Sequence, residues 1–287
     1  MKLKEIETIT RSIAWGAAKI LHSYYCGKNK FKITESSQDG PTTTADIKSN
    51  NYILKNLQIF FPKDIFGYLS EENYKYDSHH SRIQKDWVWI IDPLDGTKEF
   101  INKTGEYALH IALAYQGRPV VAVVAIPETQ TIYFATKGYG TFVEDLNHKI
   151  TQIKVSNRNT IENLSLVVSK SHRNTRFQSL IDAFSIRDIV YMGSLGKKIT
   201  TILEQKADVY ISISGKSAPK DWDFAAPDLI LTEAGGKFTY FNGDIPFYNR
   251  GDVSQWGNFI ASNGYFHEAL CEKSINSLNE IDKRVIV

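Results

Sequence analysis

A run of short β segments between residues 107 and 145 most constrains how this chain can fold. The segments are rich in apolar and β-branched residues, and turn-forming residues separate them at three places. Segments of this length joined by tight turns pair with their sequence neighbours as an antiparallel meander. Two more strands are expected before the meander, at 66–73 and 86–92, and the second is apolar on both faces, which indicates a central strand. The turns are expected at 116–119, 127–130 and 137–140.

The rhythm of the sequence changes near residue 161, from successive strands to strands that alternate with helices. Apolar residues at helical spacing also predict helices at 3–25 and 46–60, with a loop at 37–50 between them. We therefore predict a layered fold of the α/β or α+β class, with an N-terminal half, 1–160, and a C-terminal half, 161–287. The C-terminal strands are expected at 164–171, 188–193 and 207–214, and the helices at 176–184, 194–205 and 222–236.

Composition and charge argue against several classes of protein. The formal net charge is only +2 and the basic residues are scattered, so we expect no nucleic-acid partner and no attachment to a membrane. No apolar run approaches the ~20 residues of a membrane-spanning helix. Cys26 and Cys271 lie far apart without a metal-ligand spacing, which favours idle thiols in a cytoplasmic protein over a zinc site or a disulfide.

Acidic residues recur where the predicted elements begin or end. Glu71 and Glu72 follow one strand, Asp92 and Asp95 follow the next, and Asp223 begins a helix. Carboxylates on loops at the strand ends of an α/β fold converge at one edge of the sheet. Such a cluster repels itself unless cations neutralise it, and oxygen ligands without His or Cys indicate Mg²⁺, with Mn²⁺ as a substitute.

Asp92 and Asp95 form the strongest pair in this set, because the turn that joins and follows them also holds Pro, Gly and Thr. Asp92 can bridge two ions ~3.5–4 Å apart, the spacing of two-metal phosphoryl chemistry. The carbonyl of Leu94 can supply a further oxygen. The alternative is that the acids cap helices and turns, and for Asp223 taken alone helix capping is the better interpretation.

The segments GYLSEEN (67–73), WIIDPLDGT (89–97) and WDFAAPDLILTEAGG (222–236) resemble three signature blocks of the inositol monophosphatase-like phosphatases, in order and separation. TTTADIKSN (42–50) is similar to a further part of that family, so the resemblance covers nearly the whole chain. It implies an αβαβα sandwich and a phosphatase that holds two or three Mg²⁺ ions and is inhibited by Li⁺.

Carried over residue by residue, the resemblance assigns two catalytic residues and a set of metal ligands. Asp46 and Thr97 match the pair that orients and activates the attacking water. A Thr hydroxyl that is hydrogen-bonded to an Asp can accept a hydrogen bond from a metal-activated water molecule and pass charge to the Asp carboxylate. We expect in-line attack by water without a covalent phosphoenzyme. The Mg²⁺ ligands that the resemblance implies are Glu71, Asp92, Asp95, Asp223 and the carbonyl of Leu94.

The tripeptide Lys98-Glu99-Phe100 is similar to the 3'(2'),5'-bisphosphate nucleotidase branch of the family. That branch removes the 3'-phosphate of adenosine 3',5'-bisphosphate to leave AMP, and we expect activity on the sulfated nucleotide PAPS as well. The alternative is that Lys98 and Glu99 form a solvated ion pair. Within the family, inositol monophosphatase and fructose-1,6-bisphosphatase are the alternative functions, and a nucleotide sensor without catalysis is the alternative outside it.

A second phosphate needs an anion site, and the predicted helix start at Ser194 offers one. Ser194 and Lys197 lie three residues apart there, so a hydroxyl, backbone N–H groups and an ammonium converge. They resemble the Ser and Lys that bind the 5'-phosphate in the nucleotidase branch. The alternative is an ordinary helix cap with a surface lysine.

The remaining substrate contacts come from several loops. His172 lies just beyond a strand and resembles the histidine that stacks on adenine in the nucleotidase branch, while a surface histidine is the alternative. Gly96 and Asp223 are also predicted to contact the substrate. Lys216 or Lys220 is a candidate for a further phosphate contact. The expected partner is thus a small phosphorylated nucleotide, bound by a monomer or homodimer.

Overall fold

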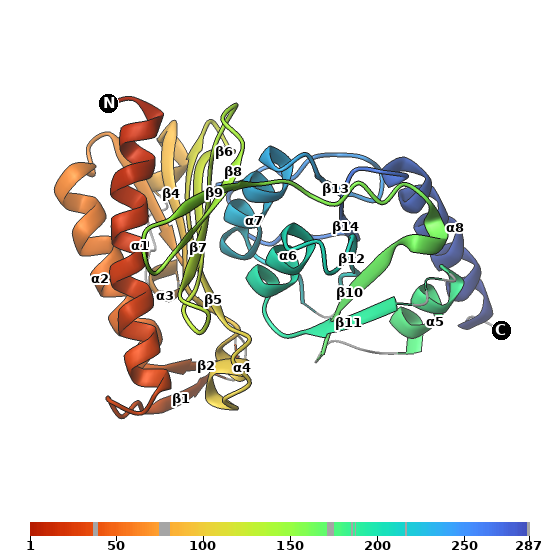
Figure 1. Cartoon of the computed structure of the whole chain (residues 1–287), viewed down its shortest axis with the longest axis horizontal. Coiled ribbons are helices and arrows are strands. Elements are labelled where there is room, and N and C mark those ends of the chain that lie inside the picture. The colour runs from red at the N-terminus through yellow and green to blue at the C-terminus, as the bar shows by residue number, and fades with distance from the viewer. Residues whose placement is uncertain are drawn as a thin grey trace.

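The computed structural model describes residues 1–36, 40–74, 81–170, 175–184, 186, 188–215 and 217–285. Helices and sheets alternate in five layers, which confirms the predicted layered fold in its αβαβα form (Figure 1). The two sheets form the second and fourth layers. The helical layers are α1 (Leu3–Tyr25) with α2 (Thr44–Phe60), then α6 (Leu195–Leu203) with α7 (Asp221–Glu233), and finally α5 (Thr175–Ala183) with α8 (His267–Val285).

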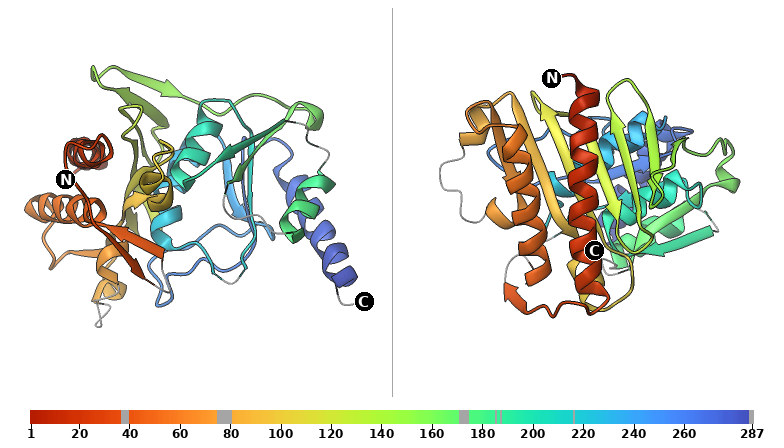
Figure 2. Two further views of the ribbon diagram at one scale, coloured as in Figure 1. Left: turned by 90° about the horizontal axis from the view of Figure 1, so that it is seen from below. Right: turned by 60° about the vertical axis from the view of Figure 1, so that its left-hand side comes forward.

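A seven-stranded sheet with the order β3-β4-β5-β6-β7-β8-β9 forms the second layer. From β4 onward each strand is antiparallel to the next, which confirms the predicted meander, while β3 and β4 run parallel. The helices α1 and α2 lie side by side over one face of this sheet (Figure 2) and bury their apolar residues against it. The strands are β3 (Phe66–Ser70), β4 (Trp87–Asp95), β5 (Ala108–Tyr115), β6 (Arg118–Ile126), β7 (Thr131–Thr136), β8 (Thr141–Asp145) and β9 (Ile150–Ile153).

A five-stranded sheet with the order β11-β10-β12-β14-β13 forms the fourth layer. Strand β10 lies between β11 and β12 and runs parallel to both, as expected where helices connect the strands. The helices α6 and α7 fill the space between the two sheets, and α5 and α8 cover the outer face. The strands are β10 (Ser165–Ser169), β11 (Asp188–Met192), β12 (Val209–Ser212), β13 (Lys237–Tyr240) and β14 (Phe259–Ser262).

The segment before α2 differs from the prediction. We predict a loop at 37–50, but β2 (Gly40–Thr43) pairs there with β1 (Ile33–Ser36), and α2 begins at Thr44. The hydroxyl of Thr43 accepts from the Ala45 N–H (3.1 Å), so the last residue of the strand also caps the helix. The loop prediction is therefore wrong for 40–45, because a four-residue strand depends on a partner that the local pattern does not reveal, whereas the helix predicted at 46–60 is confirmed.

The predicted boundary near residue 160 falls between the two sheets, since β9 ends at Ile153 and β10 begins at Ser165. Both sheets nevertheless contribute to one hydrophobic cluster around α6 and α7, so the two halves as separate domains remain a prediction. Among the helices that the structure describes, none combines the length and the apolar character needed to cross a membrane. Cys26 is exposed and Cys271 is buried, and neither is in a disulfide.

Candidate active site

The predicted acidic ligands lie on three elements that meet at one edge of the large sheet. Because β3 and β4 run parallel, their carboxyl ends share this edge, which holds Glu71 at the start of α3 (Glu71–Tyr74) and Asp92 and Asp95 at the end of β4. The register of β4 against β5 shifts between Asp92 and Asp95, and such an irregularity re-aims side chains. Asp223 lies in the first turn of α7, which packs on β4 and β5.

These four carboxylates act on one another electrostatically. Asp92 is only 2% exposed, and burial together with the charges of Glu71, Asp95 and Asp223 raises its pKa well above the usual value. Burial also raises the pKa of Asp223, to about 6, where the Lys220 N–H opposes the rise and the charge of Asp95 adds to it. Mutual repulsion of this kind is what a divalent cation relieves.

Asp95 is the exception in the cluster, because its surroundings favour the charged form. Burial opposes ionisation, yet His110, the Gly196 N–H and Lys198 lower the pKa of Asp95 below its usual value. Its Oδ1 accepts from the Leu195 N–H (3.2 Å) and its Oδ2 from the Gly196 N–H (2.6 Å). Asp95 therefore anchors the N-terminus of α6, where the helix dipole favours an anion.

The donor chemistry of the cluster fits Mg²⁺, because every candidate ligand is an oxygen atom. The orientations are set by backbone donors: Asp92 Oδ1 accepts from the Leu94 N–H (3.0 Å), and Asp223 Oδ2 accepts from the Lys220 N–H (2.6 Å). Across the residues that the structure describes, no three His, Cys, Asp or Glu side chains are already arranged as ligands of one ion. The mutual electrostatic effects support a cation site, and metal ligation itself remains a prediction.

The bond from Lys220 also bears on the alternative interpretation of Asp223. Asp223 is the third residue of α7, and its carboxylate reaches back to the backbone of the preceding cap residue. Helix capping and membership of the acidic cluster therefore coexist at this residue.

The predicted catalytic pair is in contact. Thr97 begins α4 (Thr97–Ile101) and Asp46 lies in the first turn of α2, and the Thr97 hydroxyl donates to Asp46 Oδ1 (3.1 Å). Asp46 Oδ2 accepts from the backbone N–H (2.8 Å) and the hydroxyl (2.5 Å) of Thr43. Burial raises the pKa of Asp46 in spite of these hydrogen bonds. The structure thus joins the two residues, and their role in activating water remains a prediction.

Protein acceptors already occupy the backbone N–H groups at the start of α6. Glu106 accepts from the Gly193 N–H with its Oε2 (2.9 Å) and from the Ser194 N–H with its carbonyl (3.2 Å). The next two N–H groups donate to Asp95, and Ser194 Oγ accepts from the Lys197 N–H (3.2 Å), so Ser194 caps the helix. This geometry gives the backbone no role in holding a phosphate. A substrate contact by the Ser194 side chain remains a prediction.

The lysine that faces the acids is Lys198, which we do not predict from the sequence, whereas Lys197 is partly exposed. Lys198 is 4% exposed, and its ammonium donates to the Gly193 carbonyl (2.5 Å) and lies 5.5 Å from the centre of the Tyr210 ring. Burial lowers the pKa of Lys198, while acidic groups led by Asp95 oppose that effect. A buried cation beside the acidic cluster is suited to attracting an anionic substrate.

The other predicted contacts fall in different places. Gly96 adopts a φ of +89°, and a Cβ atom there would lie 2.8 Å from the Cβ of Ser194, so the close approach of the two loops requires glycine. Lys220 donates its ammonium to Ser254 Oγ (2.8 Å). His172 and Lys216 lie outside the described residues.

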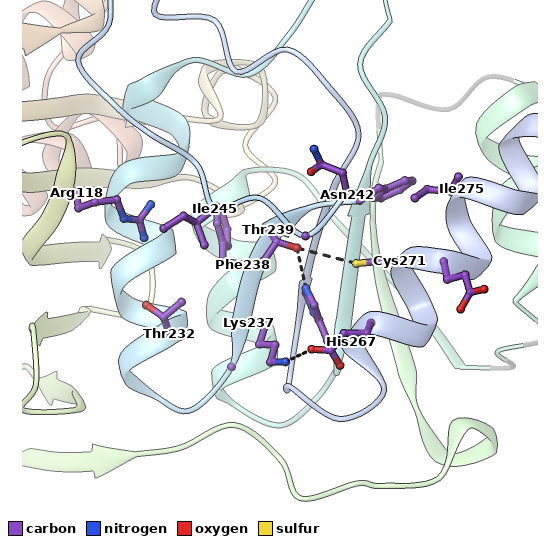
Figure 3. Close-up of a pocket in the computed structure, with 15 residues that line it drawn as sticks. Arg118, Thr232, Lys237, Phe238, Thr239, Asn242, Ile245, His267, Cys271 and Ile275 are labelled. Atoms are coloured by element: carbon purple, nitrogen blue, oxygen red, sulfur yellow. Dashed lines mark hydrogen bonds and ion pairs between the residues drawn. The ribbon is translucent and has the colours of Figure 1, made fainter.

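A separate cavity of about 560 Å³ lies at the C-terminal end of α7 (Figure 3). Its lining comes mainly from β13, the turn after it and α8, and none of the predicted site residues takes part. Its two basic lining residues are already paired, since Lys237 pairs with Glu268 and Arg118 pairs with Asp228. This cavity is therefore not the candidate active site.

Comparison with known proteins agrees with the fold and with the motifs. The chain matches the inositol monophosphatase family over residues 2–279. It is 31% identical over 225 residues to the 3'(2'),5'-bisphosphate nucleotidase CysQ of Salmonella typhimurium, which covers 78% of this chain and 85% of that protein. It is 30% identical over 260 residues to the protein of the same name from Buchnera aphidicola, with 90% and 91% covered.

Solved structures show the same relationship. CysQ from Bacteroides thetaiotaomicron, a bacterial member of the inositol monophosphatase family, is 28% identical with a TM-score of 0.73, covering 90% of this chain and 97% of that one. The suhB protein of Bartonella henselae, at 23% identity, shares the fold with a TM-score of 0.78 over 94% of this chain and 98% of its own. The family match spans nearly the whole sequence, so the chain belongs to the inositol monophosphatase family.

Proposed function

We propose that this protein is a Mg²⁺-dependent 3'(2'),5'-bisphosphate nucleotidase, which removes the 3'-phosphate of adenosine 3',5'-bisphosphate to leave AMP. The observation that carries the proposal is the hydrogen bond between Thr97, which directly follows the loop of the buried acids Asp92 and Asp95, and Asp46 on α2. The names of the CysQ relatives, which match this chain over most of its length, support the substrate class.

Five groups would hold two or three Mg²⁺ ions in this proposal. When bound, the ions neutralise the carboxylates and make a coordinated water molecule a stronger acid. We expect Mn²⁺ to substitute and Li⁺ to inhibit. The ligands are Glu71, Asp92, Asp95, Asp223 and the carbonyl of Leu94.

Thr97 and Asp46 would then orient the attacking water molecule and accept its proton. Thr97 Oγ1 lies within hydrogen-bond distance of both Asp46 Oδ1 (3.1 Å) and the Leu94 carbonyl (3.3 Å), and when its hydrogen is donated to Asp46 its lone pairs are left to accept a hydrogen bond from a water molecule. Because burial raises the pKa of Asp46, its carboxylate is a better proton acceptor than an exposed aspartate. Water is the nucleophile in this scheme, and no covalent phosphoenzyme forms.

Lys198 would attract the second phosphate of the substrate. Its ammonium is buried beside the acidic cluster, whereas Lys197 one position earlier is partly exposed. We therefore transfer the phosphate role predicted for Lys197 to Lys198. Ser194, Gly96 and His172 remain proposed neighbours of the nucleotide.

A panel of phosphate esters tests the function. Phosphate release would be measured from adenosine 3',5'-bisphosphate, PAPS, inositol 1-phosphate and fructose 1,6-bisphosphate, each with Mg²⁺, with Mn²⁺, with EDTA, and with Mg²⁺ plus Li⁺. We expect the adenosine bisphosphate to have the highest kcat/KM, with loss of activity in EDTA and inhibition by Li⁺. A preference for the inositol or fructose ester would replace the nucleotide assignment. Nucleotide binding without phosphate release would indicate a sensor.

Neighbouring lysine variants test the second-phosphate site. Lys198→Met should raise the KM for adenosine 3',5'-bisphosphate about tenfold or more, because it removes a charge-assisted contact, and should change the KM for adenosine 3'-monophosphate much less. Lys197→Met is the matched control and should change neither. Equal effects of Lys198→Met on both substrates would remove the proposed role.

A further inference from the structure

We infer that His110 is a positioning residue of the candidate metal site: its bond to α7 orients the ring, and the ring holds the Asp95 carboxylate in place. The inference rests on the proposed function, since it concerns the same site. His110 lies in β5 directly opposite Asp92 in the register of β4, and its side chain is fully buried. A buried polar ring at this depth needs specific partners, and the structure shows which groups surround it.

The first partner of the ring is on α7. His110 Nδ1 lies 3.2 Å from the carbonyl oxygen of Trp222. A carbonyl oxygen only accepts hydrogen bonds, so Nδ1 carries the hydrogen and donates it. Trp222 directly precedes Asp223, and this bond therefore ties the backbone beside a proposed ligand to the large sheet.

The second partner is Asp95. His110 Nε2 lies 3.2 Å from Asp95 Oδ2, but the direction of approach is not that of a hydrogen bond, and no described residue provides another hydrogen-bond partner for Nε2. The contact is therefore electrostatic in this conformation. At this distance the ring limits the orientations that the Asp95 carboxylate can adopt.

The ring has little freedom to move away from this position. A Cβ atom built on Gly196 would lie 2.6 Å from His110 Nε2 and 2.7 Å from the Cβ of Ala108, so the first turn of α6 packs directly against the ring. His110 is thus held between the sheet and α6, while its two nitrogens face Asp95 and α7. Asp95 is itself a proposed ligand, and α7 carries another, Asp223.

Residues that orient metal ligands through such contacts have a measurable effect on metal affinity. Substituting them typically lowers the affinity about 10–100-fold, because the ligand carboxylate loses its orientation. The polar contacts of His110 are with Asp95 and the backbone of α7, so its effect on metal affinity would pass through Asp95.

Two variants separate the contacts of the ring. His110→Asn retains an amide donor near the position of Nδ1 and loses the contact with Asp95, whereas His110→Gln places a donor near the position of Nε2. His267→Asn makes the same kind of change at a buried histidine on α8 and is the matched control. Mg²⁺ affinity would be measured by isothermal titration, and the free energy of unfolding by urea in EDTA.

We expect His110→Asn to weaken Mg²⁺ binding about tenfold or more. His110→Gln should remain within about threefold of the unsubstituted protein, and His267→Asn should not change the affinity. Unchanged affinity in His110→Asn, or equal losses in both His110 variants, would overturn the inference. If the unsubstituted protein binds no Mg²⁺, the proposed function fails instead.

A measurement on the unsubstituted protein covers the case in which a variant does not fold. The ¹⁵N signal of His110 Nε2 should shift on addition of Mg²⁺ with the same midpoint as binding. The Nδ1 signal should shift less, because its carbonyl partner is backbone. An Nε2 signal that does not respond to saturating Mg²⁺ would contradict the positioning role.

Discussion

Asp92 and Asp95 are both proposed metal ligands, yet the metal-free protein should respond to the loss of their charges in opposite directions. The pKa of Asp92 is raised by burial and by three neighbouring acids, whereas the pKa of Asp95 is lowered in spite of burial. The fold therefore resists the charge of one carboxylate and stabilises the charge of the other. Changing each residue to Asn removes the charge with little change of shape.

The expected cost of Asp95→Asn follows from its contacts. The carboxylate accepts two N–H groups of α6, at 3.2 and 2.6 Å, and hydrogen bonds to charged groups contribute about 1.5–3 kcal/mol each. Asparagine keeps one acceptor and turns an amide N–H toward the other donor. Relief of repulsion from Asp92 offsets part of the loss, so we expect the free energy of unfolding to fall by about 2 kcal/mol.

Asp92→Asn should behave differently. Its carboxylate accepts one backbone bond, from the Leu94 N–H at 3.0 Å, which an asparagine oxygen can also accept. Removing the charge relieves repulsion from the other acids of the cluster. We expect the free energy of unfolding in EDTA to be unchanged or to rise by about 1 kcal/mol.

Urea unfolding in EDTA near pH 7.5, followed by the fluorescence of the buried Trp89 and Trp222, would measure both changes. Phosphate release with Mg²⁺ would be measured in parallel, and both variants should lose most activity. The reasoning is refuted if Asp95→Asn is as stable as the unsubstituted protein in EDTA, or if Asp92→Asn is destabilised to the same extent.

Two further predictions follow from other parts of the structure. Gly96→Ala should lower the free energy of unfolding by about 2–4 kcal/mol and should also lower kcat, because a left-handed φ of +89° is combined with a 2.8 Å clash at Ser194. Gly138→Ala is the control, since Gly138 has a φ of +81° but open space around it. In urea unfolding it should cost about 1–2 kcal/mol, and it should leave kcat unchanged. Burial lowers the pKa of His267 to about 4. Between about pH 6.5 and 4 the unfolded chain therefore binds more protons than the folded protein. The free energy of unfolding should fall by about 3 kcal/mol as the pH drops through that window. His267→Asn should flatten this part of the curve, and parallel curves for the two proteins would contradict the assignment.

Short-range patterns were sufficient for most elements of the fold. The meander was predictable because its strands pair with their sequence neighbours, and α7 was predictable through its end, where Gly235 takes a φ of +94° beyond the last helical residues. The β1–β2 hairpin was not predictable in the same way. Its strands have only four residues each, and their pairing is a tertiary property.

The inward position of Lys198 was within reach of the sequence. Leu195, Lys198 and Ile202 follow one another at spacings of three and four residues, so Lys198 lies on the apolar face of its helix. The charge of lysine favours a surface interpretation, and only acids brought from other elements, led by Asp95 and Glu99, explain why this lysine is buried.

The sequence by itself determined which acids and hydroxyls the site contains, because their spacing at the ends of strands and helices is a local property. The tertiary structure decided how each one behaves. Whether a carboxylate is repelled or stabilised depends on charges and N–H groups from other elements, as Asp92 and Asp95 show although they are only three positions apart in the sequence. The role of His110 depends likewise on α6 and α7 packing against β5, since the distances between elements far apart in the chain are set by folding alone.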